Sequence, residues 1–152
     1  MNAISAMRGE KIYDVELNIV GVTDYGVSVE QILADPGAIP LHGARFDLAV
    51  DGPATGRLSG RQHGTDYLKV RADGRMELDL HIIVDTDDGH RIALSGDGQA
   101  APRPDEPVFD IFANIRLSSA AEDYKWVNER QIWSVGTASL GEGKIRIEAF
   151  MQ

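Results

Sequence analysis

The sequence predicts an all-β protein: a single small antiparallel β-barrel that is closed, with about eight strands or more and two short helices. Three observations lead to this prediction. Apolar and polar residues alternate with a period of two along many short segments, Gly-containing turn signals separate several of them, and only two segments carry helix-capping patterns. Short strands joined by tight turns are typical of barrels and sandwiches rather than of βαβ units.

The alternation is clearest in two segments. From Tyr13 to Ile19, apolar residues alternate with Asp14, Glu16 and Asn18, and from Met76 to Val84 they alternate with three polar residues. Each pattern is that of a strand with one buried face. The eight predicted strands lie at residues 13–19, 46–50, 67–71, 76–85, 91–95, 109–117, 131–137 and 145–149.

Turn residues separate these segments. Four Asp-Gly pairs and one Gly-Glu-Gly segment supply the positive φ angles that tight hairpin turns need, so each predicts a turn. The segment 99–107 contains three prolines and predicts a loop. The turn candidates are Asp51-Gly52, Asp73-Gly74, Asp88-Gly89, Asp97-Gly98 and Gly141-Glu-Gly143.

Two segments predict short helices. Ser28 and Gln31 have the spacing of a capping box, and Asp35-Pro36-Gly37 ends that helix. Ser119 and Glu122 repeat the capping pattern before Tyr124 and Val127.

Composition bounds the class of protein. The 152 residues predict one domain over residues 1–152, and 15 basic against 24 acidic residues give a net charge of −9. This balance argues against nucleic acid or an anionic membrane as a partner. The absence of cysteine excludes disulfides and thiolate chemistry. No signal peptide or membrane span is visible, so we expect a cytoplasmic protein.

The sequence offers no clear metal or cofactor site. Asp85, Asp87 and Asp88 lack the spacing of a calcium loop, and the four histidines lack the spacing of a zinc site. Phosphate-binding loops and the nucleophile elbow of hydrolases are also absent. We therefore expect neither a metal nor an organic cofactor.

The polar face of residues 76–85 is the first candidate site. Glu77, Asp79 and His81 are two residues apart, so all three point the same way. In one interpretation this face is solvated and the apolar residues fill the barrel. In the other it lines the barrel, where a carboxylate beside an imidazole can transfer protons. Arg116, inside an apolar strand, is either a salt-bridge partner or a fork for a substrate carboxylate.

The order of several motifs resembles a known family. The motifs are Gly52-Pro53, Leu58-x-Gly60, His63-Gly-Thr-Asp66-Tyr67, Arg71-Ala-Asp73-Gly74, Glu77-Leu-Asp79, Asp87-Asp-Gly89, Arg116, Tyr124-Lys-Trp126-Val-Asn128 and Val135-Gly136. Over residues 10–152 the chain resembles the family named domain of unknown function 3237. The resemblance implies a small β-barrel with a central pocket, and Asp66, Arg71, Asp79 and Arg116 as pocket residues. It also implies, for some members, cofactor-free decarboxylation of lignin-derived phenolic acids such as phenylcoumaran carboxylates.

The leading functional hypothesis is a carbon–carbon lyase that removes the carboxylate of a phenolic aromatic acid. Its predicted catalytic residues are Asp79, His81, Tyr13 and Arg116, and its predicted substrate-binding residues are Asp66, Tyr67, Arg71 and Trp126. Two alternatives stay open. One is a barrel that binds a small apolar ligand without chemistry, and the other is an interaction subunit that buries an outer strand face in a homo-oligomer.

Overall fold

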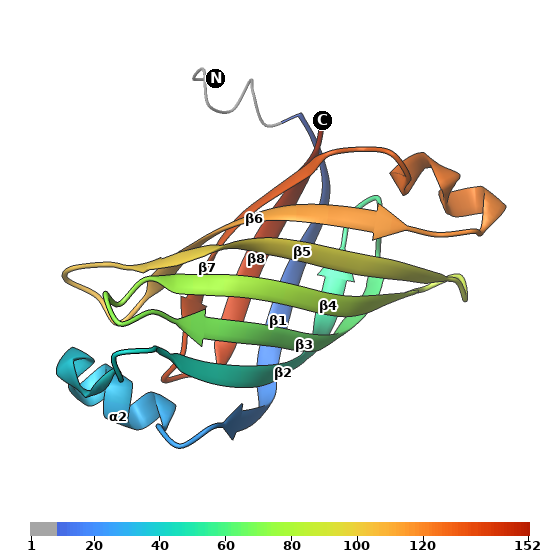
Figure 1. The fold of residues 1–152 in the computed structure, drawn as a ribbon. Helices are drawn as coiled ribbons and strands as arrows, with labels where there is room; N and C mark the ends of the chain where they lie inside the picture. Colours follow the sequence, from blue (N-terminus) through green and yellow to red (C-terminus); the bar gives the residue numbers. More distant parts are fainter. Residues whose placement is uncertain (1–8) are drawn as a thin grey trace.

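Eight antiparallel strands form one closed barrel in a computed structural model that describes residues 9–152 (Figure 1). Strand order follows the chain, and β8 pairs with β1 to close the barrel. The predicted fold class is confirmed. The strands are β1 (Glu10–Asp24), β2 (Ala44–Thr55), β3 (Gly60–Val70), β4 (Met76–Thr86), β5 (Arg91–Pro102), β6 (Phe109–Ser118), β7 (Ile132–Ser139) and β8 (Lys144–Met151).

Each of the eight predicted segments overlaps a different strand, but most of the strands are longer than predicted. β5 is the clearest case, because it extends through Gly96 and Gly98 to Pro102, where it pairs with Phe109. The prediction of a loop over 99–107 is therefore wrong for its first four residues. Two inward positions of this strand, 96 and 98, hold glycine instead of an apolar side chain, so the alternation that marks a strand is lost there.

Two of the four Asp-Gly turn predictions are wrong. Asp73-Gly74 and Asp88-Gly89 do form the turns between β3, β4 and β5, whereas Gly52 and Gly98 lie inside β2 and β5. A Cβ atom on Gly52 would collide with the carbonyl oxygen of Glu16, and one on Gly98 with that of Phe112. These glycines therefore allow neighbouring strands to approach closely.

Two short helical segments connect strands at opposite ends of the barrel (Figure 1). α2 (Val29–Ala34) has the predicted capping box with Ser28, and the 3₁₀ helix η1 (Pro36–Ala38) follows it. The 3₁₀ helix η2 (Glu122–Val127) begins three residues after Ser119, so the second capping prediction is wrong. The Ser119 hydroxyl instead accepts a hydrogen bond from the amide of Ala121. No helix of residues 9–152 is long and apolar enough to cross a membrane.

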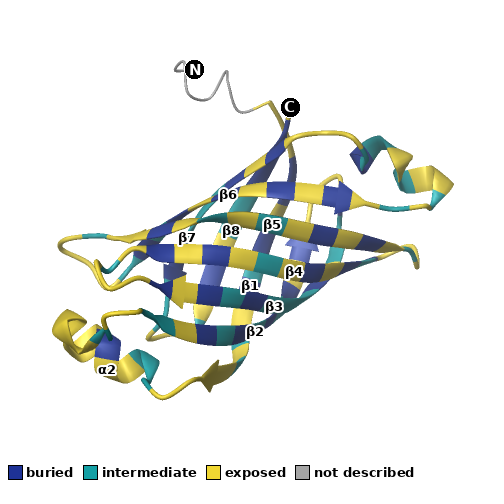
Figure 2. Ribbon diagram, viewed as in Figure 1, coloured by how far each residue is buried: buried dark blue, intermediate teal, exposed yellow. Residues whose placement is uncertain are grey.

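Apolar side chains fill the inside of the barrel. Buried and more exposed residues alternate along most of the strands, as expected when one face of each strand points inward (Figure 2). Four polar side chains, Gln62, Asp66, Thr86 and Ser134, are also buried on inward positions. Charged residues otherwise lie on the outer face or in turns.

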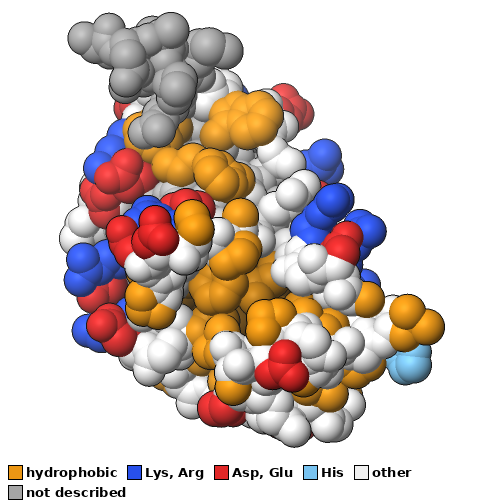
Figure 3. Space-filling model, turned by 90° about the vertical axis from the view of Figure 1, so that its left-hand side faces the viewer, with side chains coloured by type: hydrophobic (Ala, Val, Ile, Leu, Met, Phe, Trp, Pro, Cys, Tyr) orange, Lys and Arg blue, Asp and Glu red, His pale blue; other side chains and the backbone are white. Residues whose placement is uncertain are grey.

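The two ends of the barrel differ. η2 packs against one end, where Val127 is fully buried and the Tyr124 hydroxyl donates to the Asp88 carboxylate at 2.7 Å. At the other end, α2 buries Ile32 but leaves Leu33 exposed. Figure 3 shows hydrophobic side chains around a hollow at this end.

Candidate functional site

The structure separates the eight predicted site residues into four places. Four lie together on the outer face of β3, β4 and β6, and two lie inside the barrel. One lies in the turn after β3, and one lies in η2. The outer-face group is Tyr67, Asp79, His81 and Arg116, and the two inside the barrel are Tyr13 and Asp66. The residue in the turn is Arg71, and the residue in η2 is Trp126.

The polar face of β4 points outward. Met76, Leu78 and Ile82 are buried inside the barrel, and the side chains of Asp79 and His81 are 55% and 59% exposed. The interpretation in which this face lines the barrel is therefore wrong. Burial of the apolar face is favourable by about 25 cal/mol per Å² of apolar surface, and burial of the charged face would cost several kcal/mol.

An acid–imidazole pair lies on this outer face. The Oδ1 atom of Asp79 is 3.0 Å from Nε2 of His81. The ring of Tyr67 packs edge-on against the ring of His81, with 5.3 Å between centroids. An imidazole held in place by a carboxylate is a common arrangement for proton transfer in enzymes.

Asp79 also lines a groove with Arg116. The groove crosses β4 to β7 and has a volume of about 420 Å³. Strand register creates it, because Asp79 pairs with Asp97, Asp97 with Asn114, and Asn114 with Trp133. Trp133 is 49% exposed and forms one wall. The sequence prediction missed Asp97 and Asn114 as site residues, and Asp97 was assigned to a turn.

Arg116 differs from most of the other arginines. Arg45, Arg61 and Arg103 each form an ion pair with a carboxylate at 3.0 Å or less. Within residues 9–152, no ion pair involves Arg116. Its guanidinium is therefore available to bind an anion in the groove.

A buried carboxyl group lies directly beneath this surface. Asp66 points into the barrel and is 6% exposed. Its Oδ1 atom accepts a hydrogen bond from the backbone amide of Asp79 at 3.1 Å. Burial raises the pKa of Asp66 to about 7, although that hydrogen bond acts in the opposite direction. The buried carboxyl group of Asp66 therefore contacts the backbone of Asp79, which belongs to the acid–imidazole pair on the outer face.

Tyr13 lies inside the barrel, away from the groove. It is 2% exposed, pairs with Ala149 on β8, and burial raises its pKa to about 12. Its hydroxyl lies beside Gln62, which is 2% exposed. Among residues 9–152, the Nε2 atom of Gln62 has no hydrogen-bond partner. Tyr13 therefore does not join Asp79 and His81 in one site.

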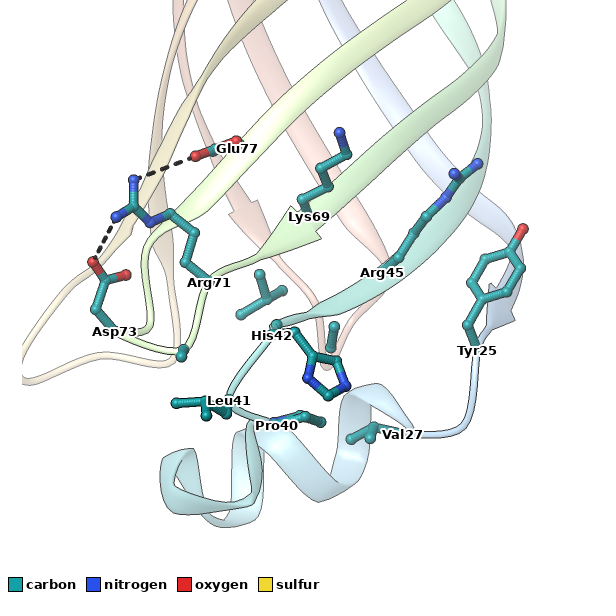
Figure 4. A pocket seen from close by; sticks show the side chains of 14 residues that line it. Tyr25, Val27, Pro40, Leu41, His42, Arg45, Lys69, Arg71, Asp73 and Glu77 are labelled. Atoms are coloured by element: carbon teal, nitrogen blue, oxygen red, sulfur yellow. Dashed lines mark ion pairs between the residues drawn. The ribbon is translucent and has the colours of Figure 1, made fainter.

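Arg71 and Trp126 are also separate from the groove. Arg71 is 3.4 Å from Asp73 and 3.6 Å from Glu77, at the side of a pocket beside α2 (Figure 4). The ring of Trp126, in η2, lies 3.8 Å below the guanidinium of Arg57. Both residues have partners that explain their positions without a substrate.

One cluster in residues 9–152 brings together three potential metal ligands. Single ligand atoms of Asp88, His90 and Asp123 lie within 4.8 Å of one another near η2. Hydrogen bonds from Thr86 and Tyr124 occupy the Asp88 carboxylate and lower its pKa. These hydrogen bonds explain the position of Asp88 without an ion, and the absence of a metal stays a prediction.

Sequence similarity to known proteins identifies the family. Residues 37–151 match the family described as Protein of unknown function (DUF3237). The chain belongs to this family. No curated protein matches the sequence.

Several solved structures are similar to this chain over almost its whole length. A β-barrel-like protein from Acinetobacter baumannii AYE has a TM-score of 0.75 and 18% identity, over 93% of each chain. A protein of unknown function from Clostridium acetobutylicum has a TM-score of 0.75 and 15% identity, over 93% of this chain and 96% of that one. An enzyme from Penicillium herquei has a TM-score of 0.65 and 18% identity, over 94% and 92%. At these identities the likeness shows the barrel fold alone.

Proposed function

We propose that this protein is a cofactor-free decarboxylase of a phenolic carboxylic acid and that the groove of Asp79 and Arg116 is its site. One observation carries the proposal: the predicted proton-transfer residue and the predicted carboxylate-binding residue line the same groove. They come from strands that are not neighbours, β4 and β6. The fungal enzyme with a similar fold is compatible with catalysis on such a barrel.

The groove offers a binding partner for each part of such a substrate. The Arg116 guanidinium, which has no ion pair in residues 9–152, can hold the carboxylate through two parallel hydrogen bonds. The half-exposed ring of Trp133 offers a flat apolar wall for the aromatic ring. His81, held by Asp79, faces the same surface and can take the phenolic proton.

In the proposed reaction the protein only transfers protons and holds the substrate, and the electrons that break the carbon–carbon bond come from the phenol. His81 accepts the phenolic proton, and the oxygen electrons move through the ring to the carbon beside the carboxylate. That carbon takes a proton from a water molecule, and the hydroxide left behind takes the proton from His81. The bond to the carboxylate of the resulting quinone methide then breaks, CO₂ leaves, and its electron pair restores the phenolate. The net change exchanges CO₂ for a proton.

The test is incubation of chelator-treated protein with a panel of phenolic carboxylic acids, followed by mass spectrometry. We expect a product that has lost the mass of CO₂. Asp79→Asn and Arg116→Ala should each slow its formation by about a hundredfold or more. Arg130→Ala, outside the groove, is the matched control and should leave the rate unchanged. Equal turnover in wild type and both groove variants, with intact circular dichroism spectra, would contradict the proposal.

A second candidate is a barrel that binds a small ligand without chemistry. The observation in its favour is the pocket beside α2, whose walls include Val27, Pro40, Leu41 and Val70 (Figure 4). Leu41 is 91% exposed, so a bound apolar molecule would cover surface that is now in water. Thermal stabilisation by an acid of the panel, without any change in its mass, would favour this candidate.

A further inference from the structure

Asp97 differs from the other carboxylates of the eight strands. It is exposed on the outer face of β5, and within residues 9–152 it forms no ion pair and no side-chain hydrogen bond. Each of the other aspartates and glutamates of β1 to β8 has such a partner. Arg116 is likewise the one strand arginine without an ion pair in this part of the chain. Both residues line the same groove.

The opposite charges of Asp97 and Arg116 are close in register but do not pair. Asp97 lies opposite Asn114 of β6, and Arg116 is two residues further along that strand. A long side chain can reach such a diagonal neighbour. No ion pair joins the two residues in the described structure, so the groove offers a carboxylate and a guanidinium to one bound molecule.

Strand register places Asp97 beside the path of the proposed substrate. His81, Ser95 and Arg116 form one row across β4, β5 and β6, and Asp79 and Asp97 belong to the next row. Neighbouring strands are about 4.8 Å apart, so about 10 Å separates the backbones at the two ends of the first row. A phenolic acid that contacts His81 with its phenol and Arg116 with its carboxylate therefore lies along this row. One edge of its ring faces Asp97.

We propose that Asp97 selects substrates that carry a second hydroxyl group next to the phenol, so that the groove takes catechol carboxylic acids. The inference rests on the proposed function, because the contact between the phenol and His81 fixes the position of that hydroxyl group. The hydroxyl group donates a hydrogen bond to the Asp97 carboxylate, and a charged acceptor makes this bond stronger than a neutral one. A methoxy group at the same ring position has no proton to donate.

The position of Asp97 has a cost to stability that ligand recognition explains. Asp97 lies directly opposite Asp79 on β4. Like charges at opposite positions of two strands destabilise a sheet. Residues that lower stability without a structural partner are typical of functional sites, where activity conflicts with stability. Replacement of Asp97 by a neutral residue should therefore leave stability unchanged or raise it.

Titration calorimetry with caffeic acid and ferulic acid tests the inference. These acids differ only in the group beside the phenol, which is a hydroxyl in the first and a methoxy in the second. We expect wild type to bind caffeic acid about tenfold or more tightly, because a hydrogen bond to a charged group has that effect. Asp97→Ala should bind the two acids equally, whereas Arg116→Ala should weaken the binding of both.

Asp110→Ala is the matched control, because it removes an aspartate of the outer face of β6 that lies outside the groove. This variant should keep the wild-type preference for caffeic acid. Urea unfolding of Asp97→Ala should show a stability equal to or above that of wild type. An equal affinity for the two acids with intact folding then assigns Asp97 to recognition rather than to the fold.

Three outcomes would overturn the inference. They are a wild type that binds neither acid, a wild type that binds both equally, and an Asp97→Ala protein that keeps the preference. The proposed function is tested separately by the loss of CO₂. If wild type prefers caffeic acid through Asp97 but no acid loses CO₂, the reaction is wrong and the recognition stands. If phenolic acids lose CO₂ without this preference, the reaction stands and the role of Asp97 is wrong.

Discussion

The inner and outer faces of β3 and β4 hold the same kind of side chain in opposite surroundings. Asp66 points into the barrel and is 6% exposed, and burial raises its pKa to about 7. Asp79 points outward, its side chain is 55% exposed, and it contacts His81 at 3.0 Å. A hydrogen bond from the backbone amide of Asp79 to the carboxyl group of Asp66 joins the two faces.

This difference shows that residue type alone does not identify a site in a barrel. Both aspartates were candidates, but the inner one lies among apolar side chains and the outer one lies in an open groove. The inner carboxyl group acts on protein stability, because its charge is costly there. The outer carboxylate can act on a bound molecule.

The largest expected effect is the pH dependence that Asp66 gives to stability. Its pKa is about 7 in the native state and about 3.9 in an unfolded chain, so the native state binds more protons between these values. The stabilisation that the raised pKa of Asp66 provides is complete below about pH 4 and is lost as the pH rises to about 7. The loss is at most about 4 kcal/mol in the free energy of unfolding.

Urea unfolding between pH 4 and pH 8 measures this contribution. We expect Asp66→Asn to remove the corresponding decrease in stability with pH. Asp105→Asn, in the exposed loop after β5, is the matched control and should keep the wild-type slope. An Asp66→Asn protein with the wild-type slope would show that the buried carboxyl group does not titrate in this range.

A smaller effect is expected at Gln62, the second polar residue of the inner face of β3. Its side chain is 2% exposed and forms a hydrogen bond with the buried hydroxyl of Tyr13. Replacement by methionine, which has a similar shape, leaves that hydroxyl without its partner inside the barrel, so the free energy of unfolding should fall by about 1–3 kcal/mol. Chemical denaturation of Gln62→Met measures it. An unchanged stability would contradict a role for this hydrogen bond in the fold.

The alternation of apolar residues predicted all eight strands because the inside of the barrel is apolar along most of their length. It failed where the inward residue is glycine. Asp97-Gly98 resembles a turn in sequence, but Gly98 lies inside β5 against the backbone of β6. A glycine required by a turn and one required by a close strand contact have the same local signature, and only the pairing distinguishes them.

The candidate site was predictable only in part. Asp79 and His81 are neighbours on one strand, so their spacing alone places them together. The addition of Arg116 and Trp133 depends on the register across β4 to β7, which no local pattern reveals. Trp126 resembles a binding residue only by its type. Its ring packs against the guanidinium of Arg57, which lies in the turn between β2 and β3.

The smallest expected effect on stability is at His81, on the outer face. Exposed ion pairs contribute about 0–1 kcal/mol, so His81→Gln should change the free energy of unfolding by no more than about 0.5 kcal/mol. The same variant should slow decarboxylation by about a hundredfold, because it removes the group that accepts the phenolic proton. Denaturation and rate measurements on one preparation test both statements. A stability loss above about 1 kcal/mol with an unchanged rate would assign the Asp79–His81 pair to the fold, and the contrast between the inner and outer aspartates would then concern stability alone.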